Sequence, residues 1–256
     1  MDALHWERVF TGMMLVGARI AGLMVFAPFF SSQAIAPRVK VCWVVALTAL
    51  LYPTCASKLP APELFAWVQG MLAEAVVGLV MGLSVHFLFD AAQLAGQVLG
   101  FQVGFSLVNV IDPQTQVDTP VLSIFHQSLA LLIFLQLDVH HWLVRGLARS
   151  FRYLPAGSAV ATPALVTELM RVVGGLWLAG VQIAGPALAA TMLADVALGF
   201  LGKASPQLPV LFLGLSIKSL LGFAVLAAGV ALWPVMFERR FAEALVHGEQ
   251  LLHLAR

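Results

Sequence analysis

Residues 64–99 read LFAWVQGMLAEAVVGLVMGLSVHFLFDAAQLAGQVL, an apolar run far longer than one membrane crossing requires. An α-helix rises about 1.5 Å per residue, so this run would make a helix about 54 Å long, against a hydrocarbon core about 30 Å thick. Such a helix must tilt, break or extend beyond the bilayer. Its glycines, among them Gly78, Gly82 and Gly96, provide places to bend and positions where another helix can approach closely.

The rest of the chain is similarly apolar. Of the 256 residues, 61% are hydrophobic and only 11% are charged, and the mean hydropathy is +0.93. Soluble domains are about 45 to 50% apolar, so one water-soluble core cannot hide this much apolar surface. Apolar runs recur at residues 9–30, 39–57, 64–99, 120–144, 164–203 and 208–237. We therefore expect an all-α membrane protein with about six hydrophobic helical segments, the long ones broken into hairpins, in a single integral-membrane domain over residues 1–256.

The basic residues are unevenly distributed between the two sides that six alternating segments would define. No Lys or Arg lies between Lys58 and Arg145. One side would carry Arg8, Lys58, Arg145, Arg149, Arg152, Arg239, Arg240 and Arg256, and the other only Arg38, Lys40 and Lys203. The positive-inside rule then predicts that both termini lie in the cytoplasm.

The last segment of the chain, residues 236–256, changes character. Apolar residues recur there near helical spacing among Glu, Arg and His. This pattern predicts a cytoplasmic or interfacial amphipathic helix, which packs on the membrane surface or on a partner.

Several ionisable residues lie inside the apolar runs. A charge at membrane depth is costly unless it is paired or hydrated, so each is a functional candidate. The main candidates are Arg19, Glu74, Asp90, Asp195 and Lys218. Two interpretations remain open, a proton or ion pathway and structural pairing, and for any single residue we favour pairing. Arg19 and Glu74 lie deepest in their runs.

Catalytic and metal motifs are absent from the sequence. It contains no HExxH, CxxC pair, GxSxG or P-loop, and we expect no enzyme activity, no cofactor and no metal. Asp138, His140 and His141 are close in sequence, but neighbouring side chains point about 100° apart on a helix and do not pair as residues at i and i+4 do. Ser106 with His126 would be the best intramembrane serine dyad, although nothing in the sequence brings the two together.

A polar loop interrupts the apolar runs at GFQVGFSLVNVIDPQTQVDTP, residues 100–120. Asp112 and Pro113 favour a turn, and Pro120 is suited to the first turn of the next helix. Further motifs are AR at residues 18–19, AP at 27–28, His141 to Val144 (HWLV), SF and LP near 150–155, and PQLPV at 206–210. In this order, the motifs resemble the flagellar biosynthetic protein FliR family and its injectisome counterpart, over most of the chain.

The resemblance implies a subunit of the flagellar type III protein export gate in the bacterial inner membrane, multi-pass and part of the flagellar basal body. It implies a FliP-like and FliQ-like helical arrangement, no catalysis, and a channel formed with FliP and FliQ for unfolded flagellar proteins. Further implied partners are FlhB and FlhA-like subunits and membrane lipids, with no role for nucleic acid. It also implies a partner-facing turn at Pro206 and Gln207.

The same resemblance implies that the loop after residue 104 projects into the pore and helps to close it. A seal around an unfolded chain needs apolar contacts without strong grip, which suits flexible, uncharged residues. The expected constriction consists of Gly104, Phe105, Ser106, Leu107, Val108, Asn109, Val110, Ile111, Asp112 and Pro113.

A different class of function remains an alternative. A secondary transporter would place a midplane site where helices break, near Gly100 and Gly185–Pro186, and would use buried carboxylates such as Glu74, Asp90 or Asp195.

Overall fold

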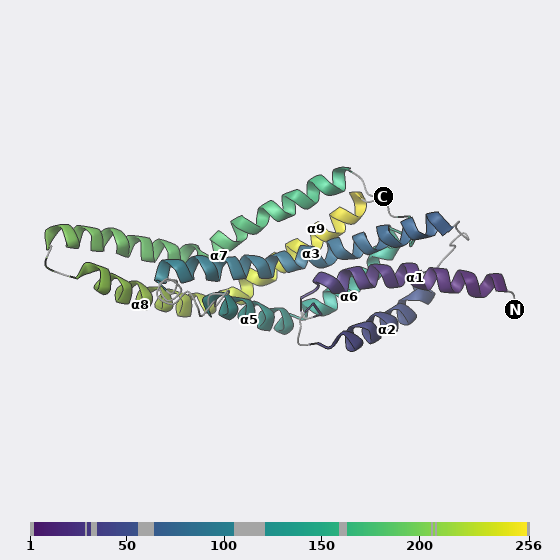
Figure 1. Cartoon of the computed structure of the whole chain (residues 1–256), viewed down its shortest axis with the longest axis horizontal. Coiled ribbons are helices and arrows are strands. Elements are labelled where there is room, and N and C mark those ends of the chain that lie inside the picture. The colour runs from purple at the N-terminus through teal and green to yellow at the C-terminus, as the bar shows by residue number, and fades with distance from the viewer. Residues whose placement is uncertain are drawn as a thin grey trace. The chain divides into compact units, whose positions relative to one another are not determined.

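The computed structural model describes residues 3–28, 30–31, 35–55, 64–104, 121–158, 163–205, 207 and 209–254. Within these ranges the chain is almost entirely helical and contains no strand, which confirms the all-α prediction. The helices, shown in Figure 1, are α1 (Ala3–Phe26), α2 (Pro37–Cys55), α3 (Leu64–Val103), α5 (Val121–Gln136), α6 (Val139–Tyr153), α7 (Pro163–Ala204), α8 (Val210–Val230) and α9 (Trp233–Leu254).

The chain divides into two compact units. The first unit comprises residues 1–87, 134–174 and 240–256, and the second comprises residues 88–133 and 175–239. The helices α3, α5, α7 and α9 each contribute residues to both units. The expectation of one domain over residues 1–256 stays a prediction.

Four helical segments are long and apolar enough to cross a membrane. They are Val9–Phe26, Phe65–Val103, Val173–Ala204 and Phe212–Val230, and the bent pair α5–α6 makes a fifth if it counts as one span. The described part of each expected apolar run is largely helical, but α2 is not among the described candidates for a span. The side on which the termini lie stays a prediction. Two cytoplasmic termini require an even number of crossings, and the candidate spans number four, or five with the bent pair.

The two longest apolar runs are not broken as expected. Helix α3 continues for 40 residues and α7 for 42, the latter through Pro186. The break falls instead between α5 and α6, which are bent by 66° relative to each other. At this break Asp138 adopts a left-handed conformation, with φ 54° and ψ 29°.

In the first unit, α1 and α3 run side by side, as Figure 1 shows. Gly78 and Gly82, one turn apart on α3, face the α1 backbone near Arg19 and Leu23. A Cβ atom on Gly82 would lie only 2.6 Å from the Leu23 carbonyl oxygen, and one on Gly78 would overlap the Arg19 carbonyl. Small residues at i and i+4 let two backbones approach closely, as in membrane helix pairs.

The second unit also contains a close helix contact. Gly96 of α3 lies against the start of α5, where an added Cβ would stand 2.6 Å from the Leu122 carbonyl oxygen. Ser123 of α5 donates a hydrogen bond to the Gln93 carbonyl at 3.2 Å. Much of the remaining α7 and α8 surface in this unit is apolar and exposed, including Leu193, Phe200, Phe212 and Leu220.

Candidate functional site

Arg19 and Glu74 form a fully buried ion pair in the first unit. The Arg19 Nε donates to Glu74 Oε2 at 2.5 Å, and both side chains have no exposed surface. The approach depends on α3, since Glu74, Gly78 and Gly82 succeed one another at four-residue intervals on the face toward α1. The glycines bring the α1 backbone close enough for Arg19 to reach the carboxylate one turn earlier.

The other polar atoms of this pair are satisfied by α6 and the turn that follows it. Arg19 Nη1 donates to Ser150 Oγ at 3.0 Å, and Nη2 donates to the Leu154 carbonyl oxygen at 3.0 Å. Glu74 Oε1 accepts a hydrogen bond from the Gly157 N–H at 2.7 Å, and Gly157 has the positive φ of 83° that favours glycine. We call Arg19, Glu74, Ser150, Leu154 and Gly157 the ionic centre.

An aromatic ring completes the ionic centre. The guanidinium carbon of Arg19 lies 4.1 Å from the centroid of the Phe151 ring, which is itself buried. Arg suits this role because its flat, always charged group can stack on a ring while its edge donates several hydrogen bonds. The ionic centre thus joins α1, α3, α6 and the turn after α6 at one buried point.

This arrangement supports structural pairing over an ion pathway for Arg19 and Glu74. A buried charge is costly, and the cost is offset only when partners satisfy its hydrogen-bonding groups. Glu74 uses both carboxylate oxygens within the protein, so neither is open to a transported ion in this conformation.

A second ion pair lies in the second unit, and it is partly exposed. Lys218 Nζ of α8 lies 2.9 Å from Asp195 Oδ1 of α7, with side-chain exposures of 19% and 46%. Gln102 of α3 donates to Asp195 Oδ2 at 2.9 Å. Ser219, next to Lys218, donates to the Val103 carbonyl at 3.0 Å. We call Asp195, Lys218 and Gln102 the outer pair cluster.

The remaining expected site residues are placed as follows. Asp90 lies on α3 and is half-buried, with interactions of its own. Gly104 ends α3 with φ 95°, its N–H bonded to the Phe101 carbonyl at 3.2 Å. Gln207 lies in an exposed turn between α7 and α8. Residues Phe105 through Pro113 and Pro206 lie outside the described residues.

The imagined serine dyad has only one member among the described residues. His126 is buried in the second unit, where its Nδ1 lies 2.7 Å from the Leu122 carbonyl oxygen. Its ring packs against Trp233, with centroids 4.9 Å apart. Ser106 lies outside the described part of the chain.

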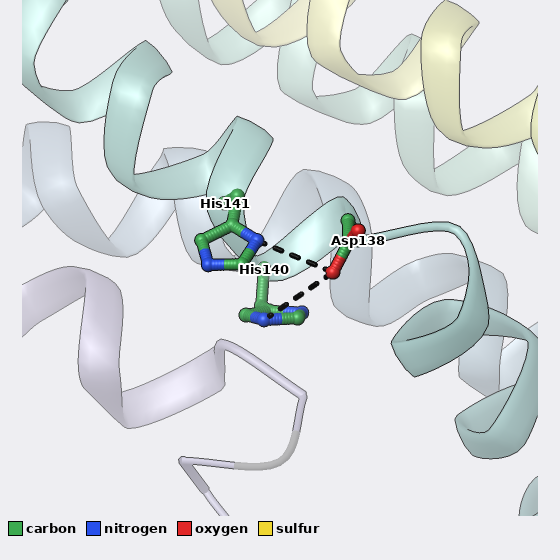
Figure 2. A group of neighbouring side chains, drawn as sticks. All are labelled: Asp138, His140 and His141. Carbon is green, nitrogen blue, oxygen red and sulfur yellow. Dashed lines mark ion pairs between the residues drawn. The ribbon is translucent and has the colours of Figure 1, made fainter.

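Asp138, His140 and His141 converge at the break between α5 and α6. Figure 2 shows both imidazoles beside one carboxylate, and His141 Nδ1 and His140 Nε2 lie 3.3 Å and 3.9 Å from Asp138 Oδ1. The two ring centroids are 4.1 Å apart. Although adjacent positions on a helix point about 100° apart, these two side chains bring their rings together at the start of α6.

Sequence reasoning missed the partners that complete each pair. Ser150, Leu154 and Gly157 act through a hydroxyl and two backbone groups, and Gln102 is an uncharged residue near a helix end. A signal did exist for the first set, because the AR, SF and LP motifs at residues 18–19, 150–151 and 154–155 all meet at the ionic centre.

The fold and the ionic centre define the class of protein: an all-α, multi-span membrane protein whose first unit is organised around a buried Arg–Glu pair.

The particular family follows from comparison with known proteins. Residues 10–244 match the family model described as bacterial export proteins, family 1, and the chain belongs to this family. It is 29% identical to the flagellar biosynthetic protein FliR of Bacillus subtilis, covering 96% of each chain. It is 30% identical to FliR of Pectobacterium carotovorum, over 94% of this chain and 92% of the relative. The surface presentation of antigens protein SpaR of Salmonella typhimurium is 28% identical, over 86% and 82%. The expected resemblance to the FliR family is confirmed.

Proposed function

We propose that this chain is a non-catalytic subunit of the flagellar type III protein export gate in the bacterial inner membrane. With FliP and FliQ it forms a channel for unfolded flagellar proteins, and FlhB and FlhA-like subunits are further partners. The observation that carries the proposal is the family match over residues 10–244, together with FliR relatives aligned over nearly their whole length.

The distribution of exposed apolar residues supports a role within a larger assembly. In an 18-residue apolar stretch of each of the candidate spans Val173–Ala204 and Phe212–Val230 only 17% of the residues are buried, against 44% in Val9–Phe26. Exposed apolar surface of this extent needs lipid or partner subunits to cover it. The polar outer pair cluster lies within this surface, and partner helices can satisfy polar groups that lipid cannot.

The loop after Gly104 is the proposed closure of the channel. Gly104 ends α3 with a positive φ, which turns the chain out of the helix at the start of the loop. The residues that follow, 105 to 113, contain five large apolar side chains and a single charge. They combine an apolar seal with little electrostatic attraction for a passing chain.

Complex formation tests the proposal directly. The full chain, expressed with the FliP and FliQ of its own organism, is expected to purify as one mixed complex with a single mass by native mass spectrometry. A chain that stays monomeric, or forms only a homodimer and transports a small solute, would contradict the gate and favour the transporter.

Deletion of residues 108–117 tests the closure. In the assembled complex, the deletion is expected to raise ion leak across vesicle membranes, because the apolar seal is lost. A matched variant replaces the same ten residues with a Gly/Ser segment of equal length. It keeps the loop length but removes the apolar side chains of the seal, so it is also expected to raise the leak. If neither variant changes the leak while both assemble normally, the loop does not close the pore.

The transporter alternative receives no support from the helix geometry. It requires broken helices near Gly100 and Gly185–Pro186, but α3 and α7 are continuous through both positions. Its best carboxylate, Glu74, is already bonded to Arg19 and Gly157.

A further inference from the structure

We propose that Asp138, His140 and His141 form a binding site for a divalent transition-metal ion, Zn²⁺ by preference, at the break between α5 and α6. This inference goes beyond the export function and replaces the sequence-based expectation that the chain holds no metal. It rests on three observations: the convergence of ligand atoms, the unused capping position of Asp138, and the lack of hydrogen bonds at His140.

The ligand atoms lie close to the spacing that a metal ion imposes. One atom from each of the three residues can be chosen so that all lie within 4.8 Å of one another. In a tetrahedral zinc site with bonds of about 2.0 to 2.1 Å, neighbouring ligand atoms are about 3.3 Å apart. The separation of His141 Nδ1 from Asp138 Oδ1 is 3.3 Å, and that of His140 Nε2 is 3.9 Å. Small side-chain rotations close the remaining gap, since Asp138 and His141 are largely exposed.

Asp138 is placed as a cap but is not used as one. It precedes α6 at the N-cap position, where an Asp side chain ordinarily accepts a backbone N–H of the first turn, yet it makes no such bond. Its carboxylate points instead toward the two imidazoles, as Figure 2 shows. Among the non-glycine residues that the structure describes, only Asp138 has a positive φ. A conformation of this kind costs free energy and is often found at ligand sites.

His140 has no hydrogen bond that would hold its ring for a structural purpose. Its Nδ1 is buried without a partner, and its Nε2 is 3.9 Å from the carboxylate, beyond hydrogen-bond range. The ring is held instead by packing against Phe134 and His141. A half-buried imidazole positioned by packing, with one nitrogen facing a carboxylate, is well prepared to bind a metal.

The chemistry of the ligand set favours zinc among the common divalent ions. Two imidazoles and one carboxylate suit Zn²⁺ better than Mg²⁺ or Ca²⁺, which prefer oxygen ligands. Three protein ligands leave one position for water or for a side chain of a neighbouring subunit. A bound ion would hold the turn before α6 against the first turn of α6, because Asp138 lies in the turn and both histidines lie on α6.

Metal titration of the purified full chain tests the site. The chain is isolated in detergent with an affinity tag free of histidine, stripped with a chelator, and titrated with Zn²⁺ by calorimetry, and with Co²⁺ by visible absorption. We expect one equivalent of saturable binding and a rise in melting temperature on addition of Zn²⁺. Asp138→Asn and His141→Ala are each expected to weaken binding about tenfold or more and to abolish the thermal shift.

The control variants separate this site from other metal-binding groups. Asn tolerates the left-handed conformation, so Asp138→Asn removes the charge without forcing a refolding of the turn. His86→Gln and Glu243→Gln remove a histidine and a carboxylate elsewhere in the first unit and are expected to bind as the unchanged chain does. No saturable binding, or binding that Asp138→Asn and His141→Ala weaken no more than the controls do, would overturn the proposal.

Discussion

Each of the two units contains an ion pair that joins two of its helices, and these two pairs differ in burial. Arg19 and Glu74 are fully buried, whereas Asp195 and Lys218 keep 46% and 19% of their side-chain surface exposed. Around the first pair, protein groups satisfy the hydrogen-bonding atoms that face inward. Around the second, the protein supplies Gln102 and leaves the outer side open. The buried pair therefore links the helices of the first unit, whereas the pair in the second unit is partly open to its surroundings.

A charge in an apolar helix can have two different roles. A buried pair is costly by itself, so its contribution depends on the geometry that surrounds it, and removal of one partner leaves an uncompensated charge. An exposed pair contributes little to stability on its own. When a partner or lipid covers the pair, the local dielectric constant falls and the attraction between the two charges becomes stronger.

Arg19→Met should have the largest effect of the changes considered, because it leaves the Glu74 carboxylate buried without a cation. We expect a loss of about 3 to 5 kcal/mol in the free energy of unfolding, measured by denaturant titration of the full chain in detergent. The double variant Arg19→Met with Glu74→Met should recover much of this loss, since it removes both charges.

The matched control for this prediction is Arg240→Met. Arg240 pairs with Glu243 at 3.2 Å, but this pair is exposed, so its loss should cost less than about 1 kcal/mol. Equal losses for Arg19→Met and Arg240→Met would show that the buried pair does not hold the first unit together.

Much of the fold could be predicted from the sequence because long apolar runs fix both helix formation and membrane insertion. The position of the break could not. Glycines and Pro186 suggested bends in the long runs, but a glycine costs a helix only about 1 kcal/mol, and α3 and α7 are continuous through these residues. The break follows Gln136 instead, where Asp138 takes a left-handed conformation that only its local turn reveals.

The candidate site was predictable in part. Arg19 and Glu74 could be singled out since charges deep in apolar runs need partners. Their pairing could not be chosen over other combinations, because a hydropathy pattern does not show which residues of two helices lie opposite each other. The groups that complete the ionic centre include the Leu154 carbonyl and the Gly157 N–H. Backbone groups of this kind occur throughout a chain, so the sequence does not indicate which of them will bind a buried charge.

Gly78→Ala should have the next largest effect, because the added methyl group would overlap the α1 backbone beside Arg19. Overpacking of this kind costs about 1 to 3 kcal/mol, and a rigid backbone neighbour favours the upper end. We expect lower thermal stability and partial separation of Arg19 from Glu74, measured by melting temperature in detergent.

Gly185→Ala provides the matched control for the helix contact. Nothing lies within 4 Å of a Cβ added there, and Ala is a better helix former than Gly by about 1 kcal/mol. This variant should therefore be neutral or slightly more stable. If Gly78→Ala were equally neutral, the close approach of α1 to α3 would not be needed for the ionic centre.

Asp195→Asn should have the smallest effect on the isolated chain, and this is where the comparison between the two pairs becomes sharpest. The change keeps the shape of the side chain and its contact with Gln102 but removes the charge opposite Lys218. Because the pair is partly exposed, we expect a loss below about 1 kcal/mol in the unfolding free energy.

The same change should reduce the yield of the complex with partner subunits, since covering the α7 and α8 surface would bury an unpaired Lys218 charge. The exchange of both residues, Asp195→Lys with Lys218→Asp, restores a pair of opposite charges and should recover the yield. A large loss of stability in the isolated chain, with normal assembly, would mean that the outer pair cluster holds its own unit together, as the ionic centre does, and does not serve an interface.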